Sequence, residues 1–420
     1  MTEPSPRPGL GWLQSLATLP LIVQIIIGLL AGILLAALYP HDTSFIPALG
    51  TLFVRALKAV APLLVLVLVA ATIARQPRGI QTSIRPIFAL YVVTMVLSAT
   101  LALCMSYLFP SHFPALAGAS SSLQPPQGVK EVLLNFVFQA VDNPFAALTG
   151  GNYIALLVWG VALGLCFRKS GDNTKQVLSD VADSVGGVVR LIIRCAPLGV
   201  MGLVYSSGTA EGGLSNLLGY VHVITVLVAT MLLVAFGVNA LVFFLVTRRN
   251  PYPAISTCIL RSGLTAFFTR SSAANIPVNL ELCKSLGLPR DTYSLSIPLG
   301  CTINMSGAAV TIVIMTMAAV NTAGVQVEFA SALIMCISAV LCACGASGVA
   351  GGSLLLIPLA CSIFGIDNDS AMQVVGIGFI ISVVQDSFET ALNSSTDVLI
   401  TMAVCDRQRG SVQEAAGSEG

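Results

Sequence analysis

The chain has 420 residues, of which 20 are Lys or Arg and 19 are Asp or Glu, and its mean hydropathy is +0.89. A soluble domain uses roughly a quarter of its residues as charged side chains, so a chain that is 9% charged and 55% apolar belongs in a bilayer. The net charge of +1 argues against nucleic acid or an anionic surface as a partner, because such binding needs clustered Lys and Arg in excess.

Six apolar stretches long enough to cross a bilayer come first. A spanning helix needs about 20 apolar residues to cover a hydrocarbon core of about 30 Å. The stretches lie at residues 17–39, 45–74, 86–109, 148–167, 184–207 and 217–247. Residues 1–16 carry one Arg and no cleavage-like end, so we expect a retained cytoplasmic tail rather than a removed signal peptide.

The positive charges predict the orientation of these spans, because cytoplasmic loops are enriched in Lys and Arg. The charges that follow even-numbered stretches are Arg75, Arg78, Arg85, Arg168, Lys169, Lys175, Arg248 and Arg249. The other loops, 40–44, 110–147 and 208–216, hold one Lys between them. We therefore expect the N-terminus in the cytoplasm, and likewise the C-terminal tail, residues 405–420.

Two later apolar stretches are each interrupted near the middle. Residues 254–286 are broken at 269–275, and residues 328–365 are broken at 345–352. The arms have about 11 to 17 residues, roughly 17 to 26 Å as helices, and cannot span. We expect two re-entrant hairpins that enter from opposite sides, followed by long spans at 291–320 and 370–404. Such an inverted repeat is typical of secondary transporters, with the binding site where the broken elements meet.

The last span carries an acidic stripe. Its members are Asp386, Thr390, Asn393 and Asp397, with Glu389 at the edge. At 100° per residue the first four lie within about 60° of one another on the helix. Each ionisable residue at the bilayer centre is costly, so the stripe predicts a site with a cation, a partner Arg or water. Arg270, beside the first break, is a candidate partner for Asp386 or Glu389.

The span at 291–320 contains a second polar break. Asn304-Met-Ser-Gly307 follows Pro298 and Gly300, which predicts locally unwound backbone with exposed carbonyl groups. Na⁺ is a hard cation and prefers oxygen ligands. The candidate Na⁺ ligands are Gly300, Asn304, Asn393 and Asp397.

The break in the first hairpin suits the binding of an anion, and the break in the second suits a lid that moves. Ser271 and Ser272 precede Pro277, a residue that favours helix starts, so backbone N–H groups and a hydroxyl face any carboxylate bound there. The glycines at the second break, including Gly348, permit close backbone approach and hinge motion.

Four segments carry a family resemblance. They are Thr-Arg-Ser-Ser-Ala-Ala-Asn-Ile-Pro (269–277), Thr-Ile-Asn-Met-Ser-Gly (302–307), Gly-Ala-Ser-Gly-Val-Ala-Gly-Gly (345–352) and Asp-Ser-Phe-Glu-Thr-Ala-Leu-Asn-Ser-Ser-Thr-Asp (386–397). In this order they resemble the signature motifs of the dicarboxylate/amino acid:cation symporters, the glutamate-transporter family. The resemblance implies an all-α integral membrane protein with eight transmembrane helices, two opposed re-entrant hairpins and an inverted repeat.

The resemblance also implies how the chain is divided. Spans one, two, four and five, at residues 17–74 and 148–207, form a scaffold and trimerisation domain. Spans three, six, seven and eight, with both hairpins, at residues 86–109 and 217–404, form a transport domain that slides as an elevator. We therefore expect a homotrimer in contact with membrane lipid.

By motif position, the resemblance implies roles for individual residues. Asp386 binds the substrate's ammonium group, and Asn393 with Ser271 and Ser272 holds its carboxylate. The residues beside the substrate are Glu389, Thr390, Gly348 and Val349. A second Na⁺ site is implied on Thr302, Ala343, Cys344 and Ala346. The protein is accordingly expected to be a transporter and not an enzyme.

Two departures from the family's pattern carry information. Dicarboxylate members have an Arg where this chain has Glu389, and a carboxylate repels the side chain of an acidic substrate. We therefore expect a small neutral amino acid with a hydroxyl, and among branches the chain looks most like the bacterial sodium-coupled serine/threonine symporters of the inner membrane. Ser306 replaces an Asp of a further Na⁺ site, which predicts fewer than three Na⁺ per cycle.

Four alternatives stay open. Within transporters they are a Na⁺-independent neutral amino-acid exchanger and a symporter of the same family for dicarboxylates or other amino acids. A cation channel also uses carboxylates and carbonyls, and saturable flux that requires both Na⁺ and serine distinguishes the symporter. An intramembrane hydrolase needs a base near its nucleophile, whereas His222 stands alone in the sixth stretch.

Overall fold

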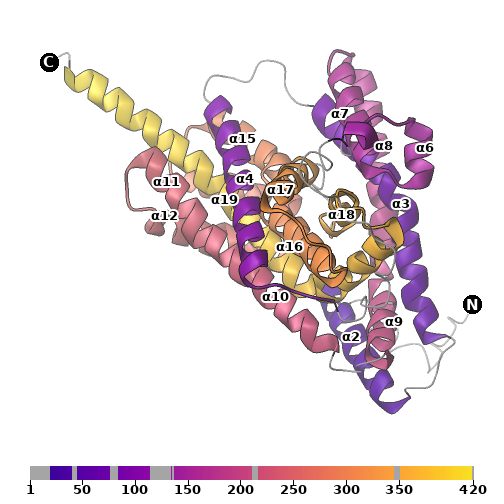
Figure 1. Ribbon diagram of the computed structural model, residues 1–420. Coiled ribbons are helices and arrows are strands. Elements are labelled where there is room, and N and C mark those ends of the chain that lie inside the picture. The colour runs from indigo at the N-terminus through magenta and orange to yellow at the C-terminus, as the bar shows by residue number, and fades with distance from the viewer. Residues whose placement is uncertain are drawn as a thin grey trace, which may run out of the picture.

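The computed structural model describes residues 19–39, 45–75, 84–113, 134, 137–210, 216–344 and 351–418. Within these ranges all regular structure is helical (Figure 1). Five helical units are long and apolar enough to cross a membrane, and a bent pair makes a sixth. The all-α membrane class is therefore confirmed. The expected tail at 1–16 and residues 345–350 of the second break lie outside the described residues.

Each of the eight expected spans corresponds to one helical unit. The units are α2 (Leu21–Leu38), α3 (Ile46–Ala74), α4 (Ile84–Leu108), α7 (Tyr153–Phe167), α8 (Asp172–Arg194) with α9 (Ala196–Thr209), α10 (Asn216–Leu233) with η3 (Val234–Val238) and α11 (Asn239–Thr247), α15 (Arg290–Ile303) with α16 (Ser306–Thr322), and α19 (Asn368–Ser418). The helices α2 and α7 are the short ones, with 18 and 15 residues.

The two interrupted stretches consist of shorter helices. The first comprises α12 (Tyr252–Cys258), η4 (Ile259–Gly263), α13 (Leu264–Thr269) and α14 (Ser272–Ser285). The second comprises α17 (Phe329–Ala343), η5 (Leu354–Leu356) and α18 (Ile357–Ser362). In the first, Arg270 turns the chain with a left-handed φ of 49°. Ser271 then caps α14, because its hydroxyl oxygen accepts a hydrogen bond from the Ala274 N–H at 3.2 Å.

The fifth span differs from the single helix expected at 184–207. Helix α8 already begins at Asp172, and α8 and α9 are bent by 54° at Cys195. Pro197, at the start of α9, has no backbone N–H and cannot continue the hydrogen-bond ladder of α8. The polar residues 172–183, expected in a loop, are helical because their apolar positions recur at helical spacing.

The ends of two other spans also differ from those expected. The fourth span begins at Tyr153 rather than at residue 148, because Gly151, with φ of 71°, ends a separate short helix, α6 (Pro144–Gly150). The last span does not end at residue 404, since α19 continues to Ser418 through most of the expected C-terminal tail. This end of α19 projects away from the other helices (Figure 1).

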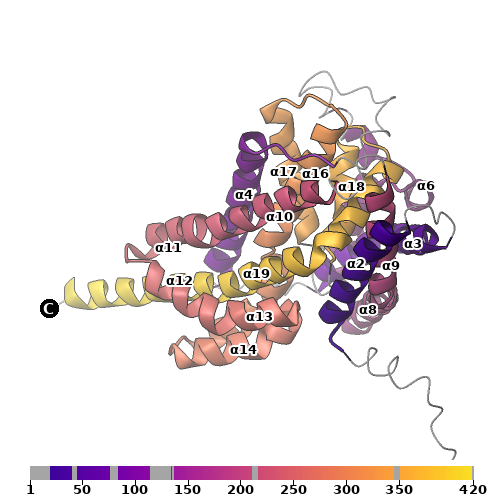
Figure 2. The same cartoon turned by 90° about the horizontal axis from the view of Figure 1, so that it is seen from below.

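Glycines pack the helices of the first half against one another. A Cβ added to Gly28 of α2 would lie 2.1 Å from the Pro197 carbonyl oxygen of α9, and one on Gly164 of α7 would lie 2.7 Å from the Ile73 side chain of α3. Lipid provides no hydrophobic drive between helices, so small residues that permit close backbone approach hold them together. We call α2, α3, α7 and α9, together with α8, which packs on α3, the glycine-packed group. Both views show it on one side of the molecule (Figures 1 and 2).

The remaining helices surround α16 and α19. Residues Ser306 to Val320 of α16 are all buried, and α16 packs on α4, α17 and α19. The first interrupted stretch, α12 to α14, lies along α19 (Figure 2). The buried polar side chains of these two helices, such as Thr311 of α16 and Asp386 and Asp397 of α19, therefore face other helices rather than lipid.

Candidate substrate and cation site

Both interrupted stretches reach Asp386 near the middle of α19. Arg270, at the turn of the first stretch, places its Nε 2.9 Å from Asp386 Oδ2, and the side chains of this pair are only 9% and 6% exposed. The backbone N–H of Gly351, at the far edge of the second break, also donates a hydrogen bond to Asp386. A buried ion pair with further hydrogen bonds lowers the cost of placing both charges in the membrane. The two broken elements and the acidic stripe thus converge at one carboxylate.

Glu389 lies one turn further along α19 and faces a different set of donors. Its Oε2 accepts hydrogen bonds from Thr311 Oγ1 at 2.8 Å, Ser353 Oγ at 2.8 Å and Gln385 Nε2 at 2.5 Å. These donors come from α16, from the second interrupted stretch and from α19 itself. Three hydrogen bonds to one buried carboxylate oxygen hold the side chain in a fixed place. Arg270 pairs with Asp386 and not with Glu389.

The chain leaves helical geometry at Asn304 and Met305, between α15 and α16. Asn304 Nδ2 donates a hydrogen bond to Asp397 Oδ1 at 2.9 Å, and the Gly307 N–H donates to Asn393 Oδ1 at 2.7 Å. Asn304, Asn393 and Asp397 are buried. The break therefore lies against the stripe, with its N–H groups directed at the Asp397 carboxylate and the Asn393 side-chain oxygen.

Gly300 also belongs to this cluster. A Cβ added to Gly300 would lie 2.5 Å from Asp397 Oδ1 and 2.8 Å from the Tyr91 hydroxyl, so only glycine fits beside the carboxylate. The Tyr91 hydroxyl donates to the Ser296 carbonyl oxygen at 3.2 Å. Tyr91 thus joins α4 to the break.

The other expected Na⁺ ligands lie near the end of α17. Cys344 Sγ donates to the Ile303 carbonyl oxygen at 3.6 Å, which places the end of α17 beside the break. Ala343 is buried, and Thr302 Oγ1 donates to the Leu299 carbonyl oxygen at 2.9 Å. Ala346, Gly348 and Val349 lie outside the described residues.

Sequence reasoning missed one polar cluster. It comprises Ser262, Asn275, Asn279 and Ser394, all buried. Asn275 Nδ2 donates to Ser394 Oγ at 2.7 Å, and Ser262 Oγ donates to Asn279 Oδ1 at 2.5 Å. The cluster ties both arms of the first interrupted stretch to α19. The signal was two Asn four residues apart, Asn275 and Asn279, a spacing that places them on one helix face.

The sequence profile of the sodium:dicarboxylate symporter family matches residues 21–406. The chain belongs to this family. It is therefore a multi-pass membrane transporter of the class that couples Na⁺ to the movement of dicarboxylates or amino acids, and the resemblance drawn from the four motifs is confirmed at this level.

In this symporter the three buried carboxylates of α19 lie in two separate clusters. One surrounds Asp386 and Glu389 and contacts both interrupted stretches; the other surrounds Asp397 and contacts the break between α15 and α16. The first combines charges of both signs, as an amino acid requires, and the second offers oxygen atoms, as a hard cation prefers. Thr390 lies between them, its hydroxyl donating to the Asp386 carbonyl oxygen at 2.7 Å.

Proposed function

We propose that this protein is a Na⁺-coupled symporter that takes up small neutral hydroxy amino acids, serine and threonine, across a bacterial inner membrane. The observation that carries the proposal is Glu389. It is buried, and donors from Thr311, Ser353 and Gln385 fix its position. A second carboxylate beside it would be repelled in a site with little water, whereas a hydroxyl can donate a hydrogen bond to it.

The proposed substrate pose extends from the first cluster to Asn393 and the start of α14. The ammonium group lies against Asp386, and the α-carboxylate lies between Asn393 and the Ser271–Ser272 segment. Arg270 supports this pose, because its buried Nη1 has no hydrogen-bond partner among the described residues, and an unpaired buried donor favours an incoming anion. Ser271 supplies the start of α14, whose N–H groups suit a carboxylate. The side-chain hydroxyl then points toward Thr390 and Glu389.

Two Na⁺ ions are proposed as co-substrates. The first binds oxygens of Gly300, Asn304, Asn393 and Asp397, with Asn304 moving off Asp397 to make room. The second binds at Thr302, Ala343, Cys344 and Ala346. Ser306, whose hydroxyl donates to Asn304 Oδ1 at 3.3 Å, replaces an acidic ligand of the family's further site, which supports fewer than three Na⁺ per cycle.

The proposed assembly is a homotrimer with both termini in the cytoplasm. The glycine-packed group would form the fixed scaffold and trimer contact, and the helices around α16 and α19 would move as one body. The close glycine contacts within the first group and the extensive burial of α16 in the second support this division.

Binding measurements test the substrate class directly. Calorimetric titration of the purified protein in Na⁺ buffer should show saturable binding of serine and threonine, and none of aspartate at the same concentrations. In K⁺ buffer serine binding should weaken at least about tenfold, since Na⁺ and substrate sites are coupled. Aspartate binding as tight as that of serine would overturn the assignment of Glu389.

A further inference from the structure

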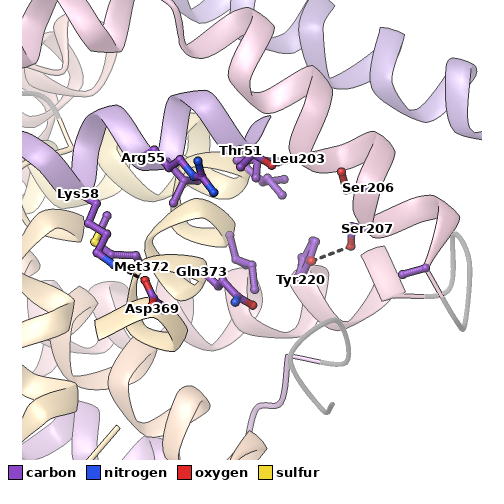
Figure 3. Close-up of a pocket in the computed structure, with 14 residues that line it drawn as sticks. Thr51, Arg55, Lys58, Leu203, Ser206, Ser207, Tyr220, Asp369, Met372 and Gln373 are labelled. Atoms are coloured by element: carbon purple, nitrogen blue, oxygen red, sulfur yellow. Dashed lines mark hydrogen bonds and ion pairs between the residues drawn. The ribbon is translucent and has the colours of Figure 1, made fainter. Parts of the chain in front are cut away.

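A cavity lies away from the candidate substrate site. Its volume is about 540 Å³, and α3 and α9 form one side while α10 and α19 form the other (Figure 3). Its lining residues include Arg55, Lys58, Leu203, Tyr220, Met372 and Ile377. Nothing in the proposed transport of serine uses these residues. The volume falls within the roughly 300–1,000 Å³ typical of small-molecule sites.

Two cations from α3 project into this cavity. Lys58 forms an ion pair with Asp369 at the start of α19. Arg55, one turn earlier on α3, is exposed and has no ion-pair or hydrogen-bond partner among the residues that the structure describes. Figure 3 shows the guanidinium between Lys58 and Thr51, facing the open space. A cation in a partly apolar cavity attracts an anion more strongly than one in water.

The opposite wall of the cavity is apolar. Met372, Ile377 and Ile380 of α19 are buried, with 1% to 6% exposure, and Leu203 of α9 adds an apolar side chain on the side of α3 (Figure 3). At the end away from Lys58, the Tyr220 and Ser207 hydroxyls form a hydrogen bond of 2.8 Å (Figure 3). The cavity therefore has a cationic rim and an apolar wall, which is the arrangement that suits an amphiphile.

We propose that this cavity binds a single-chain anionic amphiphile, with its carboxylate or phosphate head on Arg55 and its apolar chain against α19. Arginine presents parallel N–H donors that match a carboxylate or a phosphate. Two sources carry this chemistry, a free long-chain carboxylate and the headgroup with one chain of an anionic phospholipid. Either ligand contacts α3 and α9 as well as α19, and so links the glycine-packed group to the helices around α16.

The ion pair of Lys58 with Asp369 predicts that two substitutions at the rim change ligand affinity in opposite directions. Asp369 neutralises Lys58 and places a negative charge at the rim where the head binds. Asp369→Asn removes that charge and leaves Lys58 free for the ligand, so it should tighten binding. Arg55→Gln removes the cation and should weaken binding. A variant that merely disturbs folding cannot produce both effects.

The test measures binding, not transport. Purified full-length protein in detergent is titrated with radiolabelled dodecanoate, and with dodecanol as the uncharged control. We expect saturable dodecanoate binding that weakens about tenfold or more in Arg55→Gln and tightens several-fold in Asp369→Asn. Arg194→Gln is the matched control, because Arg194 is exposed at the end of α8, and it should bind as the parent does.

The lipid arm distinguishes the two sources. Protein is reconstituted in vesicles of phosphatidylcholine with or without phosphatidylglycerol, and lipid that remains bound after detergent extraction is identified by mass spectrometry. Phosphatidylglycerol retained by the parent and lost in Arg55→Gln assigns the site to lipid, whether or not dodecanoate binds. Dodecanoate binding that depends on Arg55, without retained lipid, assigns it to a free amphiphile. If Arg55→Gln changes neither measurement, the proposal is wrong.

Discussion

At the residue scale, the three buried carboxylates of α19 have different surroundings. Asp386 meets a cation and a backbone N–H, Glu389 meets three side-chain donors, and Asp397 meets an amide and a glycine. Asp386 lies opposite the Arg270 guanidinium, so it can exchange this cation for the ammonium group of a substrate. A carboxylate among neutral oxygens and amides suits a metal cation. These differences separate the proposed roles of the three residues.

Asp386→Asn should abolish serine uptake. The amide cannot neutralise the substrate's ammonium group, and it also leaves Arg270 buried without its partner. Serine binding should weaken at least about a hundredfold in calorimetric titration, because a buried charge pair broken on one side costs roughly 3–5 kcal/mol. Asp291→Asn, at the exposed start of α15, is the control. Normal serine affinity in Asp386→Asn would refute the ammonium role.

Glu389→Arg should admit acidic substrates. The substitution replaces the repelling carboxylate by a cation that can pair with a side-chain carboxylate. Unlabelled aspartate should then compete with serine binding, which it should not do in the parent. Glu389→Gln is the control, since it removes the charge without adding a cation. Unchanged rejection of aspartate by Glu389→Arg would mean that pocket shape, rather than charge, sets the specificity.

Asp397→Asn should raise the Na⁺ requirement before it affects the substrate. The variant loses one negative ligand next to Gly300 and Asn304. The Na⁺ concentration for half-maximal uptake should rise about tenfold or more, while the serine concentration for half-maximal uptake at saturating Na⁺ should change little. An equal change in both would show that Asp397 acts on the substrate site as a whole.

Helical periodicity predicted much of this site. It predicted that Asp386, Asn393 and Asp397 share one face of the last span, and the structure places all three against other helices. It could not predict that Glu389 turns toward Thr311 and Ser353, because those donors come from segments distant in the sequence. The cluster at Asn275 was missed for the same reason: only the packing of the first interrupted stretch on α19 brings Ser394 to it.

At the element scale, the elements that sequence patterns predicted well are those with breaks marked by glycine, proline or polar residues. The break at Asn304 and the turn at Arg270 follow this rule. The fifth span differs from the single helix expected, because it bends by 54° at Cys195, just before Pro197, within a stretch that hydropathy treats as one long run. Hydropathy measures length and composition, so it does not register a bend within an apolar run.

The packing of α7 on α3 makes a further prediction. Gly164→Leu should destabilise the protein, because a Cβ there would already lie 2.7 Å from Ile73 and 2.9 Å from the Ala70 carbonyl oxygen. Overpacking typically costs 1–3 kcal/mol, and contact with a backbone atom leaves little room to relax. The midpoint of thermal unfolding in detergent should fall by several degrees.

Gly237→Leu is the matched control for that measurement. An added Cβ at Gly237 meets nothing within 4 Å, so its unfolding midpoint should stay close to that of the parent. Equal midpoints for Gly164→Leu and Gly237→Leu would show that the close approach of α7 to α3 does not contribute to stability.

At the scale of the whole molecule, two groups of helices meet along α3, α9 and α19. The glycine-packed group holds its members by close backbone contacts, and the other group holds the polar clusters. Across their boundary lie the ion pair of Lys58 with Asp369 and the cavity that Arg55 lines. Movement of the polar clusters relative to the first group would therefore require this boundary to rearrange, while both clusters stay intact on α19.

In the proposed mechanism, Na⁺ binding beside Asp397 drives serine held at Asp386 across the membrane. The most direct test is uptake of radiolabelled serine into proteoliposomes with an imposed inward Na⁺ gradient. We expect serine to accumulate above its external concentration, and we expect accumulation to cease when K⁺ replaces Na⁺ on both sides. Uphill serine uptake that persists without a Na⁺ gradient would contradict the account.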